Sequence, residues 1–266
     1  MRQARWVAVG LLATLAFACG VWVMGCPAGA TCLTAGGAMV SAFTLAATAS
    51  LVLIVLALSW PLRAMWLYRQ SSIEVRRLQR MSLPSALLAA MGRTRTHNVE
   101  CIEGSSPQAF CAGVLHPTVF MTPALIDRLD ASQLDAVLLH ERHHAERREP
   151  LRRAVLKAAS DVFFFIPLLR WWAERRLEES ELAADRAAIG QLGRRTVARA
   201  LWHAAAREPR GLPAFGGAIE ARVAQILGER LDSRPPAPSL WLTSAAGSIL
   251  VVSTAVCLAH VLLAVS

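Results

Sequence analysis

The residues best suited to chemistry are two histidines four positions apart, with a glutamate beside the first. His140, Glu141 and His144 form an H-E-x-x-H pattern on a helix that we predict over residues 133–148. Residues i and i+4 share a helix face, so both imidazoles can reach one metal ion. Zinc with three protein ligands keeps a fourth position for water and lowers the pKa of that water towards about 7. Glu141 would act as general base and later pass the proton to a leaving amine.

The third ligand would be a carboxylate further along the chain. Glu181 and Asp185 again stand four positions apart, and the alanines between them allow close packing against the histidine helix. We predict that Glu181 binds the metal and that Asp185 accepts a hydrogen bond from a ligand histidine. The other acidic residues nearby are expected to be solvated charges among arginines: Glu174, Glu178 and Glu179.

The plain alternative to a metal site is a solvated helix face. Arg142, His143 and Glu146 are also polar, and a short pattern of this kind can arise by chance. The apolar residues that lead into the pattern and the register of its histidines favour metal ligation. His143 lies about 100° around the helix from His144, so we expect it to be exposed or to face the substrate.

The histidine helix has clear start and stop signals. Asp130 and Ser132 can cap its start, and Pro150 should end it. Upstream, a short helix should begin at residues 122–123, with proline at its first helical position.

Two further helices are expected downstream. One should start at Leu151 and hold the apolar run 163–169, which is either buried core or an interfacial wedge that enters the membrane surface. The next, over residues 171–189, would carry Glu181 and Asp185.

A small sheet is expected before the histidine helix, after a helix over residues 63–87. If the first two of its strands form a hairpin, Cys101 and Cys111 fall nearly opposite each other, as a buried pair rather than a redox switch. Three segments have the alternation and turn boundaries of short strands: residues 98–103, 109–115 and 118–121.

The composition points to a membrane protein. The 266 residues are 55% hydrophobic and 18% charged, with a mean hydropathy of +0.40, whereas soluble domains average about 45–50% apolar and about 25% charged residues. We expect the first apolar segment to be an anchor rather than a cleaved signal peptide. Three segments have about the length of 20 residues that a spanning helix needs: residues 6–24, 37–60 and 240–265.

The arginines set the expected orientation. They precede the first apolar segment, follow the second and precede the third, whereas the loop 25–35 has no charge. By the positive-inside rule, the N-terminus and residues 61–239 face the cytoplasm and the C-terminus lies outside. The net charge of +9 then suits contact with anionic membrane lipid, and we expect no nucleic-acid partner. Cys26 and Cys32 in the outside loop form a disulfide or stay free thiols; both readings remain open.

The predicted fold is therefore that of a mainly α membrane protein. Transmembrane helices would flank a cytoplasmic α+β domain, residues 61–239, with a small β-sheet and the metal site. That length suits one small domain.

Residues 105–189 resemble the BlaR/MecR-type membrane metallopeptidases, the protease part of beta-lactam-sensing signal transducers. The resemblance rests on the zinc-helix pattern from His140 to His144, on the aromatic-x-Pro-Leu step at 165–168, and on residues 181–185, where that family usually has Cys in place of Ala184. It covers about a third of the chain. It implies a gluzincin domain in which His140, His144 and Glu181 bind zinc and Glu141 is the base.

Two departures limit what this resemblance implies. The sensors carry a penicillin-binding domain after the last span, whereas this chain ends at Ser266, so we expect it not to sense a beta-lactam in that way. They also have four spans where we count three. The outside loop is too short for a sensor domain, so a partner protein could supply the signal; a homodimer is also open.

The predicted function is that of a membrane-anchored zinc endopeptidase acting on a cytoplasmic, repressor-like protein or on itself. An edge strand within residues 109–121 would hold an extended protein or peptide substrate by strand addition. One alternative is an HtpX-type quality-control protease, although the gap to the later glutamate is usually longer there than the 36 residues between His144 and Glu181. The other is a non-catalytic membrane signalling or scaffold protein.

Overall fold

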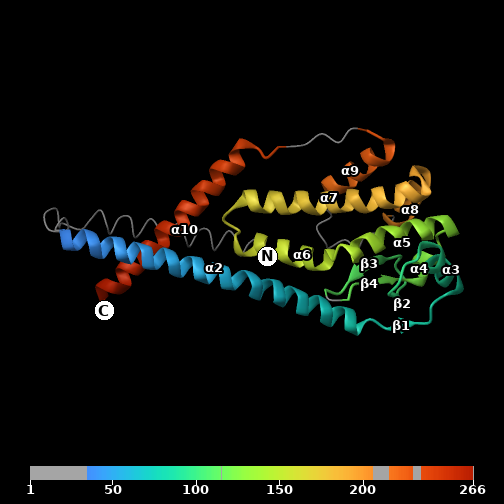
Figure 1. Cartoon of the computed structure of the whole chain (residues 1–266), viewed down its shortest axis with the longest axis horizontal. Helices are drawn as coiled ribbons and strands as arrows, with labels where there is room; N and C mark the ends of the chain where they lie inside the picture. The colour runs from blue at the N-terminus through green and yellow to red at the C-terminus, as the bar shows by residue number, and fades with distance from the viewer. Residues whose placement is uncertain (1–34, 115, 206–215, 230–234, 266) are drawn as a thin grey trace. The chain divides into compact units, whose positions relative to one another are not determined.

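The computed structural model describes residues 35–114, 116–205, 216–229 and 235–265. The first predicted span, residues 6–24, and the pair Cys26 and Cys32 lie outside the described residues. The mainly helical chain with one small mixed sheet agrees with the predicted class of fold (Figure 1). In chain order the elements are α2 (Ala35–Arg77), β1 (Arg80–Met81), α3 (Ser85–Thr94), β2 (Val99–Ile102), β3 (Ala109–Ala112), β4 (Thr118–Met121), α4 (Pro123–Ile126), α5 (Ala131–Glu146), α6 (Glu149–Val162), α7 (Pro167–Leu192), α8 (Arg194–Ala205), α9 (Gly216–Leu227) and α10 (Pro238–Val265).

The chain divides into two compact units. The site unit, residues 63–158 and 171–235, holds the sheet and every residue predicted for the metal site. The apolar unit comprises residues 1–62, 159–170 and 236–266.

The apolar unit contains most of α2 and all of α10, the helices on which the second and third predicted spans fall. Within these helices, Ser50–Arg77 and Pro238–Ala255 are long and apolar enough to cross a membrane. Large apolar side chains of α2 such as Leu53 and Leu58 are exposed, as lipid contact would require. In this unit α10 approaches the backbone of Phe165 so closely at Gly247 that a Cβ would overlap the Phe165 carbonyl oxygen.

The sheet is mixed and has the strand order β1-β2-β4-β3. β2 and β4 are parallel, and the other two pairs are antiparallel. The hairpin considered for the first two strand segments does not form, because β4 lies between β2 and β3. Cys101 aligns with Met121 and Cys111 with Val119, so the two cysteines are not opposite each other.

Thr122, just after β4, ties the start of β3 to the end of β4. Its hydroxyl donates to the carbonyl oxygen of Ser106 at 2.9 Å and accepts from the backbone N–H of Gln108 at 3.0 Å. Its own N–H donates to the Gln108 carbonyl at 3.0 Å. These bonds hold the chain before β3 against the end of β4, which leaves β3 at an edge of the described sheet.

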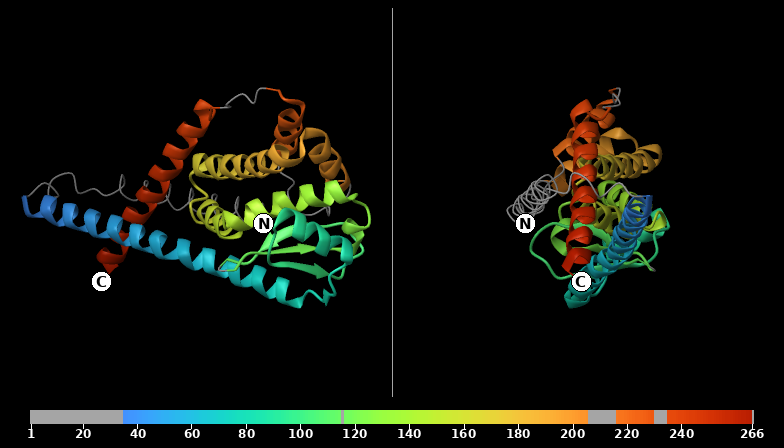
Figure 2. Two further views of the ribbon diagram at one scale, coloured as in Figure 1. Left: turned by 45° about the vertical axis from the view of Figure 1, so that its right-hand side comes forward. Right: turned by 90° about the vertical axis from the view of Figure 1, so that its left-hand side faces the viewer.

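The two faces of the sheet pack on different helices. One face, with Val119 and Met121, shares its core with α5. The opposite face, with Ile102 and Phe120, packs against Val75 of α2 and its neighbour Leu78. Figure 2 shows the strands between α5 and the C-terminal part of α2. The edge strand β3 thus lies next to the helix that carries both histidines.

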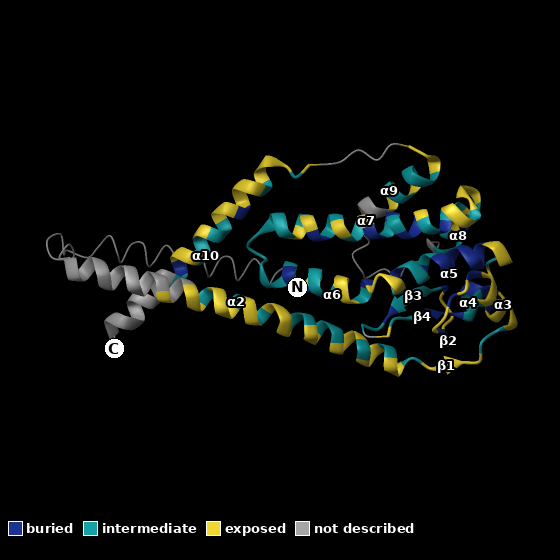
Figure 3. Ribbon diagram, viewed as in Figure 1, coloured by how far each residue is buried: buried dark blue, intermediate teal, exposed yellow. Residues whose placement is uncertain are grey.

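Helix α5 is mostly buried and has a strong N-terminal cap (Figure 3). The Asp130 carboxylate accepts the backbone N–H of Gln133 at 2.8 Å, and the Gln133 side chain accepts the N–H of Asp130, which makes a capping box. Ser132 donates to Asp130 instead of capping the helix itself. The helix ends at Glu146, before Pro150, because Arg148 adopts a left-handed φ of 51°. Pro150 instead lies in the first turn of α6, where its missing N–H needs no partner.

The sequence predicted that the apolar run 163–169 lies within one helix, and this prediction is wrong. α6 ends at Val162 and α7 begins at Pro167. Proline lacks an N–H and disfavours helical backbone at the residue before it, here Ile166. α7 then covers the helix predicted over 171–189.

The helix predicted over 63–87 is wrong beyond Arg77. The chain leaves α2 there, forms β1 and re-enters a helix only at Ser85. Pro84 before it is extended, with φ −61° and ψ 148°, and would break a continuous helix. Helix α8 follows α7 in a stretch for which no element was predicted.

Candidate metal site

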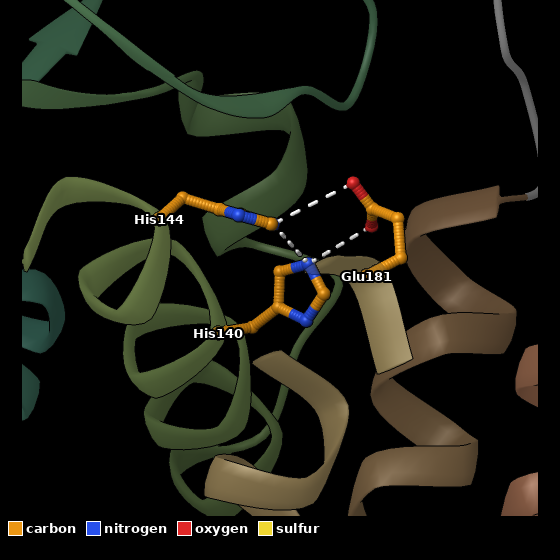
Figure 4. A group of neighbouring side chains, drawn as sticks. All are labelled: His140, His144 and Glu181. Atoms are coloured by element: carbon orange, nitrogen blue, oxygen red, sulfur yellow. Dashed lines mark hydrogen bonds and ion pairs between the residues drawn. The ribbon is translucent and has the colours of Figure 1, made fainter. Parts of the chain in front are cut away.

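Helices α5 and α7 bring three of the predicted residues to one point. His140 and His144 come from successive turns of α5 and Glu181 from α7 (Figure 4). The Nε2 atoms of the two histidines are 3.0 Å apart. The Glu181 carboxylate lies 3.4 Å from Nε2 of His140 and 3.6 Å from Nε2 of His144. One donor atom of each residue lies within 4.8 Å of the others, close enough to share one metal ion.

The donor set fits a zinc ion. Two imidazole nitrogens and one carboxylate oxygen are a ligand set of catalytic zinc sites, which leave one position open. His140 and Glu181 retain some exposure, whereas His144 is buried. The cluster therefore combines a buried wall with a side that solvent reaches.

Asp185 sets the orientation of His140. Its carboxylate is fully buried and lies 2.9 Å from Nδ1 of His140. When His140 is neutral, an N–H at Nδ1 leaves the lone pair of Nε2 directed towards Glu181 and His144. The structure thus places Asp185 where the sequence analysis expected an acceptor for a ligand histidine.

The two histidines have opposite pKa shifts. Burial disfavours the charged form of His140, but hydrogen bonds to Asp185 and Glu181 outweigh burial and raise its pKa to about 9. Burial and the neighbouring charge of His140 lower the pKa of His144 to about 3. At neutral pH the metal-free His144 is therefore neutral, as a metal-binding imidazole must be, whereas His140 is protonated and would release a proton on binding a metal.

Two arginines that the sequence analysis did not single out hold the Glu181 carboxylate. Arg222 of α9 lies 3.3 Å from its Oε2, and Arg153 of α6 donates a hydrogen bond to its Oε1. Burial would raise the pKa of Glu181, but its hydrogen bond with His140 and the charges of His140 and Arg153 hold that pKa well below its usual value. The carboxylate is ionised, as a metal ligand must be.

Arg222 also forms a two-pronged pair with Asp185. Its Nε lies 2.7 Å from Oδ2 and its Nη2 lies 2.8 Å from Oδ1. Burial would raise the pKa of Asp185, but hydrogen bonds from His140 and Arg222 lower it. No sequence signal marks this contact, because 37 positions separate the partners and the chain has 27 arginines.

Glu141, the predicted base, follows His140 in the sequence, and its side chain is buried. Burial raises its pKa, and the nearby charge of His140 opposes that shift. A carboxylate with a raised pKa is suited to take up and release a proton near neutral pH.

The remaining candidates lie outside the ligand cluster. Glu178 lies 3.5 Å from Arg175, and Glu179 lies 3.1 Å from Arg176, as expected for charges among arginines. The ring of His143 is 6.4 Å from that of His144, and burial lowers its pKa. His143 is partly exposed and belongs to no metal-binding group among the described residues.

The whole arrangement can be compared with known protein families. A family model described as BlaR1 peptidase M56 matches residues 33–223, well over half of the chain. The match spans α5, α7 and Arg222 on α9. No curated protein matches the chain.

Proposed function

The chain belongs to the BlaR1 peptidase M56 family, a family of metallopeptidases, and from that premise we propose that it is a zinc-dependent endopeptidase anchored in the cytoplasmic membrane. The observation that carries the proposal is the meeting of His140, His144 and Glu181, with Asp185 on the far nitrogen of His140. Two helices long and apolar enough to cross a membrane support the anchoring.

Each residue of the cluster has a proposed task. His140, His144 and Glu181 would hold the zinc ion, and Asp185 would keep Nε2 of His140 available for it. The bound ion would polarise the scissile carbonyl and lower the pKa of a water ligand. Glu141 would take the proton from that water and give it to the leaving amine nitrogen.

The open strand β3 offers a place for an extended substrate. Strand addition would pair the substrate backbone with β3 and direct its side chains alternately to the two faces of the sheet. A pocket of about 510 Å³ lies on the α2 side, lined by Phe110 and Ala112 of β3, the loop 103–106, and Ser71 and Glu74 of α2. That pocket would receive alternate side chains of the substrate.

We place the site on the cytoplasmic side because arginines flank the apolar segments on that side. The proposed substrate is a cytoplasmic regulatory protein of the repressor kind, or the chain itself, in a signalling role. A partner protein would supply the signal, and membrane lipid would surround the exposed apolar side chains of α2.

The first test is zinc stoichiometry by elemental analysis on the full chain in detergent, for wild type and Glu181→Ala. One zinc per wild-type chain and a sharp loss in the variant are expected. No zinc in the wild type, even after titration, would contradict the proposal and favour the scaffold alternative. Cleavage of candidate repressors at one or few sites, against broad degradation of casein, separates the regulatory role from quality control.

A further inference from the structure

We propose that Arg222 is a positioning residue for the metal site, acting on His140 through Asp185. The inference rests on the proposed metallopeptidase function and adds a residue from α9, a helix that carries none of the predicted ligands. Arg222 would not touch the metal or the substrate. It would hold the carboxylates of Asp185 and Glu181 in position next to the ion.

The contacts form one continuous chain from α9 to the candidate ligands. Arg222 holds both oxygens of Asp185 at 2.7 and 2.8 Å, and Asp185 lies 2.9 Å from Nδ1 of His140. Asp185 is fully buried and its partners are mostly buried: 18% of the Arg222 side chain, 1% of Asp185 and 13% of His140 are exposed. A third contact, 3.3 Å from Nη1 of Arg222 to Oε2 of Glu181, joins the second carboxylate of α7 to the same guanidinium.

Because Asp185 is buried, the loss of its partner Arg222 should have a large effect. An ionised carboxylate inside a protein needs hydrogen-bonded partners of opposite charge, and removal of one partner leaves an uncompensated charge. Without Arg222, Asp185 would turn towards solvent or take up a proton, and Nδ1 of His140 would lose its fixed acceptor. A planar guanidinium matches two carboxylate oxygens at once, which a lysine ammonium does not.

The structure also supplies a matched control on the same helix. Gln225 lies one turn after Arg222, donates to the carbonyl oxygen of Leu182 at 3.1 Å and accepts from Arg186 at 3.2 Å. It joins α9 to α7 as Arg222 does, but it has no hydrogen bond to a residue of the cluster among those described. Gln225→Ala therefore measures how much zinc affinity is lost when α9 is held less firmly on α7 but the contacts of Arg222 are kept.

The test measures zinc affinity by chelator competition and the visible spectrum of the cobalt-substituted protein, with the full chain in detergent. Loss of a residue that orients a metal ligand typically weakens metal binding about 10- to 100-fold. We expect a loss of that size for Arg222→Met, a smaller loss with a shifted cobalt spectrum for Arg222→Lys, and less than about threefold for Gln225→Ala. In an Asp185→Asn background, Arg222→Met should add less than it costs alone, since only its contact with Glu181 is then left to lose.

The outcomes separate this inference from the proposed function. If the wild type binds no zinc or cobalt, both fall. If the wild type binds zinc and Arg222→Met binds it equally well with an unchanged cobalt spectrum, only the role of Arg222 falls. An equal loss in Gln225→Ala, or full additivity with Asp185→Asn, also overturns it. Should Arg222→Met not fold, Arg222→Lys decides alone, and an unchanged spectrum counts against the inference.

Discussion

The two sides of the candidate metal site are built differently. On the inner side, Nδ1 of His140 contacts Asp185, and Arg222 holds Asp185 with two hydrogen bonds. On the outer side, Nδ1 of His144 has no hydrogen-bond partner among the described residues, and Arg153, with 46% of its side chain exposed, contacts Glu181. On the inner side buried charges hold His140, although 13% of that side chain is exposed; on the outer side His144 is itself buried, and the contact that solvent can replace is that of Arg153 with Glu181.

This difference suggests a division of labour. A ligand whose far nitrogen is hydrogen-bonded to a buried carboxylate is held in one orientation before metal arrives. Under the proposed function the outer side admits water and a peptide, so it would not be equally closed. We therefore expect changes on the inner side to act on metal affinity and changes on the outer side to act on catalysis.

The largest expected effect comes from Glu141→Gln. Removal of a general base typically costs about 10²- to 10⁴-fold in rate, and we expect a loss of that order in proteolysis with zinc content unchanged. The glutamine keeps the size of the side chain but cannot accept the proton from water. Proteolysis at the wild-type rate, measured at equal zinc occupancy, would end the assignment of Glu141 as the base.

The reactivity of the Cys111 thiol on β3 tests how far water reaches the outer side. Burial and the charge of Glu141 raise the pKa of this thiol to about 12. The thiolate is then scarce below pH 12, and its higher nucleophilicity offsets only part of that scarcity. At pH 8 we expect metal-free Cys111 to react with iodoacetamide about 50-fold more slowly than a free peptide of residues 109–113.

The pH profile checks the same point. Alkylation of Cys111, followed by mass spectrometry of its peptide, should keep rising about tenfold per pH unit through pH 10, where the free peptide has levelled off. A plateau near pH 9 would show a hydrated thiol and a more open outer side.

Asp185→Asn tests the inner side. The amide cannot accept two charged partners as the carboxylate does, so we expect zinc affinity to fall about 10- to 100-fold. Proteolysis should recover when free zinc is raised, because Glu141 is intact. An activity loss that excess zinc does not restore would break the proposed division between the two sides.

The residues of the site differ in how far the sequence predicted them. His140, His144 and the pair Glu181 and Asp185 follow a spacing of four on a helix, a local rule that any reader of the chain can apply. Arg222 follows no such rule, because its contact depends on how α9 packs on α7.

The fold shows the same limit. The cap at Asp130 and the helix it starts were predictable from neighbouring residues. The strand order was not, because it depends on pairings between distant segments, such as the bonds that join Thr122 to residues 14 and 16 positions before it. Pro84 and Pro167 did carry local signals, and the predicted helices that crossed them gave too little weight to proline.

The smallest expected effect is that of Arg153→Met on the outer side. Its partner Glu181 keeps contacts with His140 and Arg222, and an exposed ion pair contributes at most about 1 kcal/mol. We expect the melting temperature to change little and zinc affinity to change less than about threefold, measured by chelator competition. Arg152→Met is the matched control, since 51% of that side chain is exposed and it pairs with Glu149 rather than with Glu181. A tenfold loss of zinc affinity in Arg153→Met alone would mean that the outer side is as firmly organised as the inner one.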